Sequence, residues 1–189
     1  MKEQQLYSAK IDHTEKTIET LYRMQRYTYD KPHILLRLGI GLVLAALALT
    51  VTMPMWTKAL VLLAGAWLLA SKDFPAQMRA DRVLQERKAA LPKMNYTFYD
   101  EHLDLSGEGS MSIDYKKLGR LAEDERFFYL FLSRDSVCML EKDSLKPQKQ
   151  DDFKRFLEEK SALQWRREKS FLSMNLPDLI QILRDRRNQ

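Results

Sequence analysis

The side chains that most often carry out catalysis or bind metals are few and scattered in this sequence. The three histidines, His13, His33 and His102, fall in different segments, and none has a cysteine or paired carboxylate nearby at the spacing of metal ligands. Cys138 is the only cysteine, and it lies in the apolar run Val137–Leu140, where a thiol is usually a small buried hydrophobe. These residues predict no metal site, no catalytic cysteine and no intrachain disulfide.

Two further polar segments are better explained as turns than as active-site loops. Residues 106–110 (SGEGS) are rich in glycine but lack the lysine and the following helix of a phosphate-binding loop, so they predict a hairpin turn. Glu123, Asp124 and Glu125 form a charged turn, and the sequence identifies no buried partner that would allow acid–base chemistry. We therefore expect a protein without catalytic residues and without a cofactor.

The charge distribution argues against nucleic acid as a ligand. The 189-residue chain has 31 Lys and Arg against 26 Asp and Glu, a net charge of +5. Residues 94–165 hold 11 basic and 15 acidic residues, a net charge of −4, whereas residues 72–93 hold 6 basic and 3 acidic residues, a net charge of +3. Nucleic-acid-binding domains usually carry a basic stripe, so an acidic domain predicts no such partner.

Two long apolar runs predict a transmembrane hairpin over residues 33–71. The run from Leu38 to Met53 has no charge, and with residues 34–37 it reaches the length of about 20 residues that a spanning helix needs. Pro54 interrupts the pattern, and a second run, 59–70, reaches roughly spanning length if residues 55–71 are counted. The side chains expected at the membrane interfaces are Arg37, Trp56 and Lys58.

The flanking charges predict the orientation of this hairpin. Basic residues precede and follow it, whereas the connecting turn offers only Lys58, so both termini should be cytoplasmic and the protein should cross the inner membrane twice. A pair of buried core helices is the alternative, and apolar residues on all sides of both helices disfavour it. The small residues Gly41, Ala45, Ala66 and Ala70 are expected to pack the two helices together, and a homo-oligomer interface is the second interpretation.

Two segments flank the hairpin. Residues 1–32 are expected to form a strand and a helix, with Asp12–Glu15 marking the start of the helix. Residues 72–93 are expected to form a basic juxtamembrane helix. Its candidate contacts with anionic lipid are Arg79, Arg82, Arg87 and Lys88, although ordinary topology-setting charge explains the same residues.

The chain changes character after this helix. Short aromatic and β-branched stretches separated by turn signals predict an antiparallel meander within a domain of residues 94–165. The alternation of Tyr96 and Phe98, then of Leu103 and Leu105, predicts that one face of the sheet is buried. A helix expected over 151–161 has an apolar face that can cover the sheet.

In this order of elements the chain resembles the bacterial YcxB-like family of membrane proteins. The resemblance is carried by Tyr96–Asp100, Ile113–Tyr115 with Leu118, Glu123 and Asp124, Phe128–Leu130, Met139–Lys142 and Phe153–Leu157. It implies an α+β membrane protein in which a two-helix transmembrane hairpin carries a small antiparallel β domain. That domain is expected to be pleckstrin-homology-like, a barrel-like sheet capped by a C-terminal helix, with no established activity. The sequence departs from the family pattern at Glu141 and in its long tail after Trp165.

The tail, residues 166–189, is predicted to contain an amphipathic helix. Its apolar residues recur at the i, i+3, i+4 and i+7 positions of one helix face, and these candidate interaction residues are Leu176, Leu179, Ile180 and Leu183. The sequence leaves three alternatives for where this helix packs: its own domain, the membrane surface or the groove of a partner.

The combined prediction is a membrane-anchored cytoplasmic interaction module. We expect it to bind a protein partner through an exposed sheet edge or the tail helix, in contact with membrane lipids. The alternative is a module that senses anionic lipid or organises the membrane through its basic residues.

Overall fold

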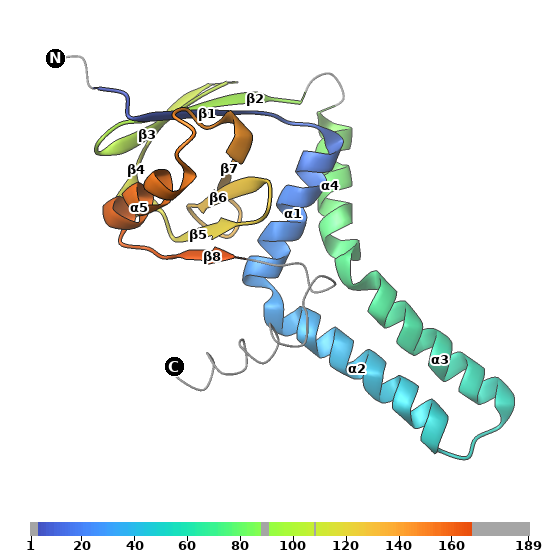
Figure 1. Ribbon diagram of the computed structural model, residues 1–189. Coiled ribbons are helices and arrows are strands. Elements are labelled where there is room, and N and C mark those ends of the chain that lie inside the picture. Colours follow the sequence, from blue (N-terminus) through green and yellow to red (C-terminus); the bar gives the residue numbers. More distant parts are fainter. Residues whose placement is uncertain (1–3, 88–90, 108, 168–189) are drawn as a thin grey trace. The chain divides into compact units, whose positions relative to one another are not determined.

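The computed structural model describes residues 4–87, 91–107 and 109–167, and within them the protein is α+β. The chain divides into two compact units (Figure 1). The helical unit is Asp12–Lys93, and the β unit combines Met1–Ile11 with Met94–Gln189.

The helical unit begins with a capped helix. Its elements are α1 (Glu15–Tyr29), α2 (Lys31–Thr50), α3 (Met55–Ala70), the 3-10 turn η1 (Ser71–Asp73) and α4 (Phe74–Glu86). The residue that caps α1 is Thr14: its side chain accepts a hydrogen bond from the Thr17 backbone N–H at 3.3 Å, and Thr17 Oγ1 accepts from the Thr14 N–H at 2.7 Å. The expected cap thus shifts from Asp12 and Glu15 to two threonines, which supply the same reciprocal bonds.

Helices α2 and α3 form an antiparallel hairpin whose backbones approach closely at two glycines (Figure 1). A Cβ atom on Gly41 would lie 2.9 Å from the Leu69 side chain, and one on Gly65 would lie 3.1 Å from the Gly41 carbonyl oxygen. Small residues therefore pack the hairpin together, as expected for Gly41. On α3, however, the residue at the contact is Gly65, whereas Ala66 and Ala70 are exposed.

Among the described residues, one helix is long and apolar enough to cross a membrane by itself. Helix α2 has 20 residues, about 30 Å at 1.5 Å per residue. Helix α3 has only 16 residues, and it passes the same test only together with α4, across a bend of 52°. The structure thus provides one candidate span, and a hairpin with two membrane crossings is still a prediction.

The β unit consists of two four-stranded sheets and one helix. Its strands are β1 (Tyr7–Asp12), β2 (Lys93–Phe98), β3 (His102–Ser106), β4 (Ser110–Asp114), β5 (Arg120–Glu123), β6 (Phe127–Phe131), β7 (Val137–Glu141) and β8 (Trp165–Arg167). The 3-10 turns η2 (Tyr115–Lys117) and η3 (Lys142–Ser144) precede helix α5 (Gln150–Ser161). The strand orders are β1-β2-β3-β4 and β7-β6-β5-β8, and only the short β8 is parallel to its neighbour β5.

The predicted meander and its buried face are confirmed. Tyr96 pairs with Leu105 and Phe98 pairs with Leu103, and all four side chains are buried. The glycine-rich segment 106–110 connects β3 to β4 as a hairpin, with Ser106 opposite Ser110.

The first strand belongs to the sheet of the β unit, although the sequence pattern grouped it with the helix that follows. Strand β1 lies beside β2, and its Ala9 and Ile11 are buried. Its outer edge is paired with the segment after η3, since Ser8 and Lys146 exchange two backbone hydrogen bonds of 2.8 and 2.7 Å. A partner more than 80 residues away in the chain leaves no local pattern in the sequence.

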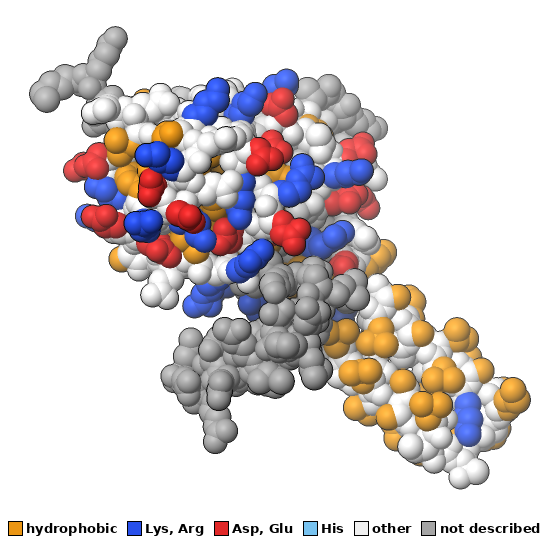
Figure 2. All heavy atoms as spheres, in the orientation of Figure 1, with side chains coloured by type: hydrophobic (Ala, Val, Ile, Leu, Met, Phe, Trp, Pro, Cys, Tyr) orange, Lys and Arg blue, Asp and Glu red, His pale blue; other side chains and the backbone are white. Residues whose placement is uncertain are grey.

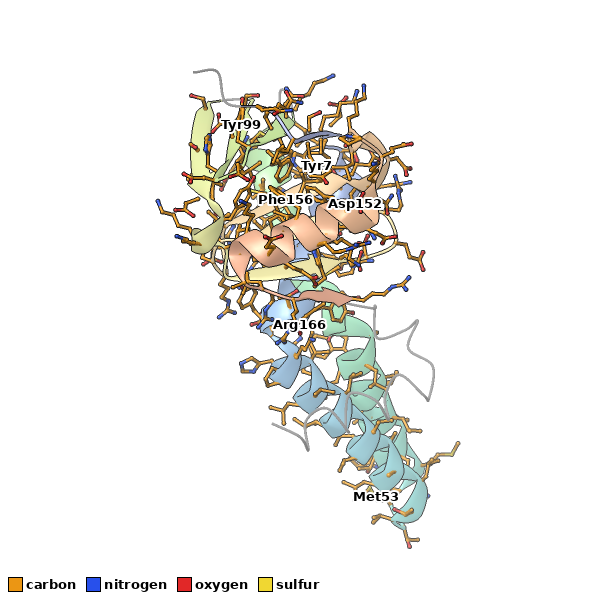
Figure 3. The ribbon with its side chains drawn as sticks, turned by 60° about the vertical axis from the view of Figure 1, so that its left-hand side comes forward. Tyr7, Met53, Tyr99, Asp152, Phe156 and Arg166 are labelled. Carbon is orange, nitrogen blue, oxygen red and sulfur yellow. The ribbon has the colours of Figure 1, made fainter. Side chains whose placement is uncertain are left out.

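Helix α5 closes the core of the β unit, as its apolar face predicts. The Phe153 side chain is fully buried, and its ring centroid lies 4.9 Å from that of Phe98 and 5.4 Å from that of Phe128. Tyr7 of β1 adds a ring contact to Phe153 at 5.2 Å and one to Phe156 at 5.4 Å (Figure 3). Residues from both ends and the middle of the chain therefore share one aromatic core.

Candidate membrane-binding and partner-binding surfaces

The side chains with catalytic potential that the structure describes, such as His13, His102 and Cys138, are buried or packed against other residues. In the parts of the chain that the structure describes, no group of three or more His, Cys, Asp or Glu side chains could hold a metal ion. His102 stacks on Tyr99 with ring centroids 4.9 Å apart. Burial, followed by the charge of Arg87, lowers the pKa of His13 below its ordinary value. Burial also raises the pKa of the Cys138 thiol to about 12, so this cysteine is a poor nucleophile.

Glu123 has partners that the sequence did not identify. Its Oε2 lies 2.7 Å from Lys142 Nζ, and its Oε1 lies 2.5 Å from Lys154 Nζ. Burial alone would raise the pKa of this carboxyl group, but hydrogen bonds from both lysines and their charges hold the pKa below its ordinary value. Asp124 does form the expected turn, accepting hydrogen bonds from the Arg126 and Phe127 backbone N–H groups at 2.8 and 2.7 Å. Glu123 is therefore a paired carboxylate that holds β5, η3 and α5 together.

The hairpin presents an apolar surface. Of the large hydrophobic side chains that are exposed in the described residues, all but Phe74, Met78 and Met111 lie between Leu35 and Trp67. Figure 2 shows these side chains gathered over the α2–α3 hairpin, whereas basic and acidic side chains are intermixed over the β unit. An apolar surface of this extent is typical of a site that contacts lipid or another protein.

Charged and amphipathic side chains lie at both ends of that surface. Arg37 is half-buried on α2, and its Nη1 donates a 3.5 Å hydrogen bond to the Ser71 carbonyl oxygen, so it lies beside the end of α3. Trp56 is exposed in the first turn of α3, and Lys58 is half-buried there. Between Arg37 and Lys58 the sequence contains no charged residue. These are the positions that interface residues of a spanning hairpin would occupy.

The predicted lipid contacts divide into those on α4 and those beyond it. Arg79 and Arg82 are exposed on α4, and the exposed Arg87 follows its last residue. Lys88 lies outside the described residues, as do the predicted interaction residues Leu176, Leu179, Ile180 and Leu183. Ala76 and Ala80 are buried on the opposite side of α4 from two exposed apolar residues, Phe74 and Met78. The sequence did not indicate that Arg79 and Arg37 lie near enough to Arg26 for their charges to lower its pKa.

Comparison with known proteins identifies the central part of the β unit. Residues 98–157 match the YcxB-like protein family. This match confirms the resemblance over residues 98–157, from the last residue of β2 into α5. No curated protein and no solved structure matches the chain. In this chain β1 and β8, which complete the two sheets, come from outside the YcxB-like segment.

The YcxB-like segment contains the strand that ends the first sheet. Among the described strands, β4 pairs only with β3, and Ser110, Met111 and Ser112 on it are exposed. Met111 is opposite the buried Leu105 and is itself 57% exposed, so it extends the apolar inner face of the sheet to its edge. The strand contains neither lysine nor proline, the residues that commonly protect sheet edges from pairing. The edge of β4 is therefore a candidate site for an added strand.

Proposed function

We propose that this protein is a two-pass inner-membrane protein whose β unit is a cytoplasmic interaction module without catalytic activity. In this proposal the α2–α3 hairpin crosses the membrane, and a protein partner adds an extended segment to the edge of β4. The observation that carries the proposal is the apolar surface of the hairpin, which is exposed on both helices and free of charge between Arg37 and Lys58.

The dimensions of the hairpin support two membrane crossings. Helix α2, at about 30 Å, matches the thickness of the hydrocarbon core. Helix α3, with 16 residues, is about 24 Å long, and slight thinning of the bilayer together with outward extension of the Lys58 side chain accommodates the difference. The tight Gly41–Gly65 contact keeps the two helices side by side without water between their backbones.

A labelling experiment tests the two crossings. A Thr52→Cys variant places a thiol in the exposed connection between α2 and α3, and the buried Cys138 does not compete for the reagent. We expect a membrane-impermeant maleimide to label this thiol in intact cells but not in sealed inverted vesicles. The matched control, Gln5→Cys at an exposed position near the N-terminus, should show the reverse pattern. Labelling of both thiols from the same side would show that the hairpin does not cross the membrane.

The fold of the β unit supports an interaction role. Strands β2–β4 and β5–β7 form two antiparallel meanders in separate sheets, and α5 covers their shared aromatic core. Strand addition uses backbone groups for affinity and alternate side chains for specificity. Because Met111 is uncharged and exposed at the edge, we expect the added segment to carry apolar side chains on its inner face.

A single charge at the edge tests strand addition. Full-length tagged protein, purified from membranes in mild detergent, is compared with a Met111→Lys variant, in which the ammonium group opposes pairing, and with Met111→Leu, which keeps the apolar side chain. We expect a stoichiometric protein to purify with the wild type and Met111→Leu, and its yield to fall at least roughly tenfold with Met111→Lys. A partner that is unaffected by Met111→Lys but lost from a chain ending at Arg167, which keeps β8, would instead place the interaction in the tail.

A second candidate function, binding of anionic lipid, is favoured by the composition of α4. Exposed Phe74 and Met78 lie one turn apart, with Arg79 and Arg82 beside or beyond them. Apolar side chains followed by arginines along a helix are typical of a segment in the headgroup region of a bilayer. If anionic lipid alone is enriched in the purification, this function replaces partner binding.

A further inference from the structure

Four elements of the helical unit bring charged side chains together at the base of the hairpin. Arg26 lies in the last turn of α1, Arg37 in the second turn of α2, Asp73 in η1 and Arg79 on α4. Tyr27 OH donates a 2.8 Å hydrogen bond to Asp73 Oδ1, which joins α1 to η1. Arg37 Nη1 contacts the Ser71 carbonyl oxygen at 3.5 Å, two residues away from Asp73. The cluster therefore combines three guanidinium groups from three different helices.

Arg26 contributes a buried donor, its Nε, without a hydrogen-bond partner among the described residues. Burial is the largest cause that lowers the pKa of Arg26; Arg37 and Arg79 lower the pKa further, whereas Asp30 and Asp73 raise it. Among the described residues, three guanidinium groups thus lie near two carboxylates, and one buried N–H group lacks an acceptor. An anion bound at this cluster would offset its excess of positive charge.

The chemistry of the cluster favours a phosphate group. Guanidinium groups bind phosphate through paired N–H donors in a fixed planar geometry. The uncharged surface of α2 begins immediately after Arg37, so the cluster lies at the boundary between apolar and polar surface, where phospholipid phosphates are found. Phe74 and Met78, exposed on the helix that carries Arg79, are suited to contact the acyl chains of the same lipid.

We propose that Arg26, Arg37 and Arg79 form a binding site for the phosphate of an anionic phospholipid in the cytoplasmic leaflet. This proposal rests on insertion of the hairpin into the membrane, because only then does the cluster reach the headgroups. It assigns the lipid to one site and not to the whole basic face of α4. Arg82, exposed one turn beyond Met78, is outside the site.

The test compares two arginines of the same helix in the full-length protein. Wild type, Arg79→Gln and Arg82→Gln are reconstituted in nanodiscs of neutral phosphatidylcholine, with and without phosphatidylglycerol, and their thermal unfolding is followed. Both variants lose one positive charge from an exposed position on α4. The general electrostatic attraction of the protein to an anionic membrane therefore falls by the same amount in both. We expect phosphatidylglycerol to raise the unfolding temperature of wild type and Arg82→Gln, and binding to weaken roughly tenfold in Arg79→Gln.

Every other outcome of this comparison would contradict either the proposed site or the proposed ligand. Equal loss in both variants would show diffuse attraction and overturn the site, as would the absence of any effect of phosphatidylglycerol on wild type. A further measurement adds inorganic phosphate to the protein in neutral nanodiscs. If millimolar phosphate raises the unfolding temperature as much as phosphatidylglycerol does, the lipid assignment is wrong and the ligand is a soluble phosphate. Labelling of Thr52→Cys separates these results from a failure of the membrane topology. Arg26→Gln, which relieves the buried N–H, should also lose the response to lipid while keeping its stability in neutral nanodiscs.

Discussion

Replacing Phe153 by alanine is expected to lower the free energy of unfolding of the β unit by about 3–5 kcal/mol. The ring is fully buried where α5 meets both sheets, with Tyr7, Phe98 and Phe128 around it. No neighbouring side chain can fill the space without leaving its own contacts, because these rings are held by different strands. The loss is a large fraction of the whole stability of a domain of this size.

The labelling of Cys138 by a thiol reagent measures the stability of the Phe153→Ala variant. Cys138 is the only cysteine, it is buried on β7, and its high thiol pKa keeps it unreactive while the unit is folded. Its labelling by a thiol reagent in detergent and increasing urea therefore reports opening of the β unit. We expect the labelling midpoint of Phe153→Ala to fall by at least about 1 M urea, or labelling to proceed without urea.

Two related variants control for local effects of the substitution. Phe153→Leu should retain part of the packing and keep the midpoint measurable. Phe156→Ala removes a half-buried ring from the same helix and should cost less, about 1–2 kcal/mol. Equal midpoints for Phe153→Ala and Phe156→Ala would contradict the central position of Phe153 in the core.

The second large effect is expected at Glu123. Glu123→Gln should destabilise the β unit at neutral pH by about 2–3 kcal/mol, because two lysines that are largely removed from water would face a neutral acceptor. This value is below that for a fully buried pair because the Lys154 side chain is 28% exposed. Lys142 also lies over the Phe128 ring at 4.8 Å, so loss of its position would disturb the aromatic core.

The pH dependence of this effect has a defined sign. The folded protein holds the pKa of Glu123 below its ordinary value of 4.5, so the stabilisation is fully present above about pH 4.5. As the pH falls below that value and passes through the lowered pKa of the folded state, the carboxylate is protonated and the stabilisation is lost. The stabilities of wild type and Glu123→Gln should therefore differ by a constant amount above pH 4.5 and converge below it.

Trp165 reports this convergence. Its ring lies 5.0 Å from that of Phe128, and replacing Trp56 and Trp67 of the hairpin by phenylalanine leaves Trp165 as the only tryptophan. Urea unfolding followed by its fluorescence at a series of pH values gives the stability of each variant. The control is Glu125→Gln, at an exposed neighbouring position, whose stability should follow that of the wild type. A constant difference across the acid range would show that Glu123 does not titrate as described.

The local elements of both units follow from the sequence. The hairpin helices follow from uncharged runs and a proline, since helix formation in an apolar segment depends on residues that are close in the chain. The strands β2 to β7 follow from alternation and turn residues for the same reason. The interface positions predicted for Arg37, Trp56 and Lys58 likewise depend only on where the apolar runs begin and end.

Contacts between segments that are distant in the chain could not be predicted from local sequence patterns. The pairing of β1 with β2, the partners of Glu123 and the use of Gly65 in place of Ala66 each depend on which surfaces meet after folding. The Arg26, Arg37 and Arg79 cluster is of the same kind, because its members are separated by 11 and 42 residues and meet only when four helical segments converge. The sequence alone thus determined the local elements and the resemblance of residues 98–157 to the YcxB-like family. The tertiary structure decided the ion pairs, the open edge and the cationic cluster, because burial and charge partners are properties of assembled surfaces and not of a chain segment.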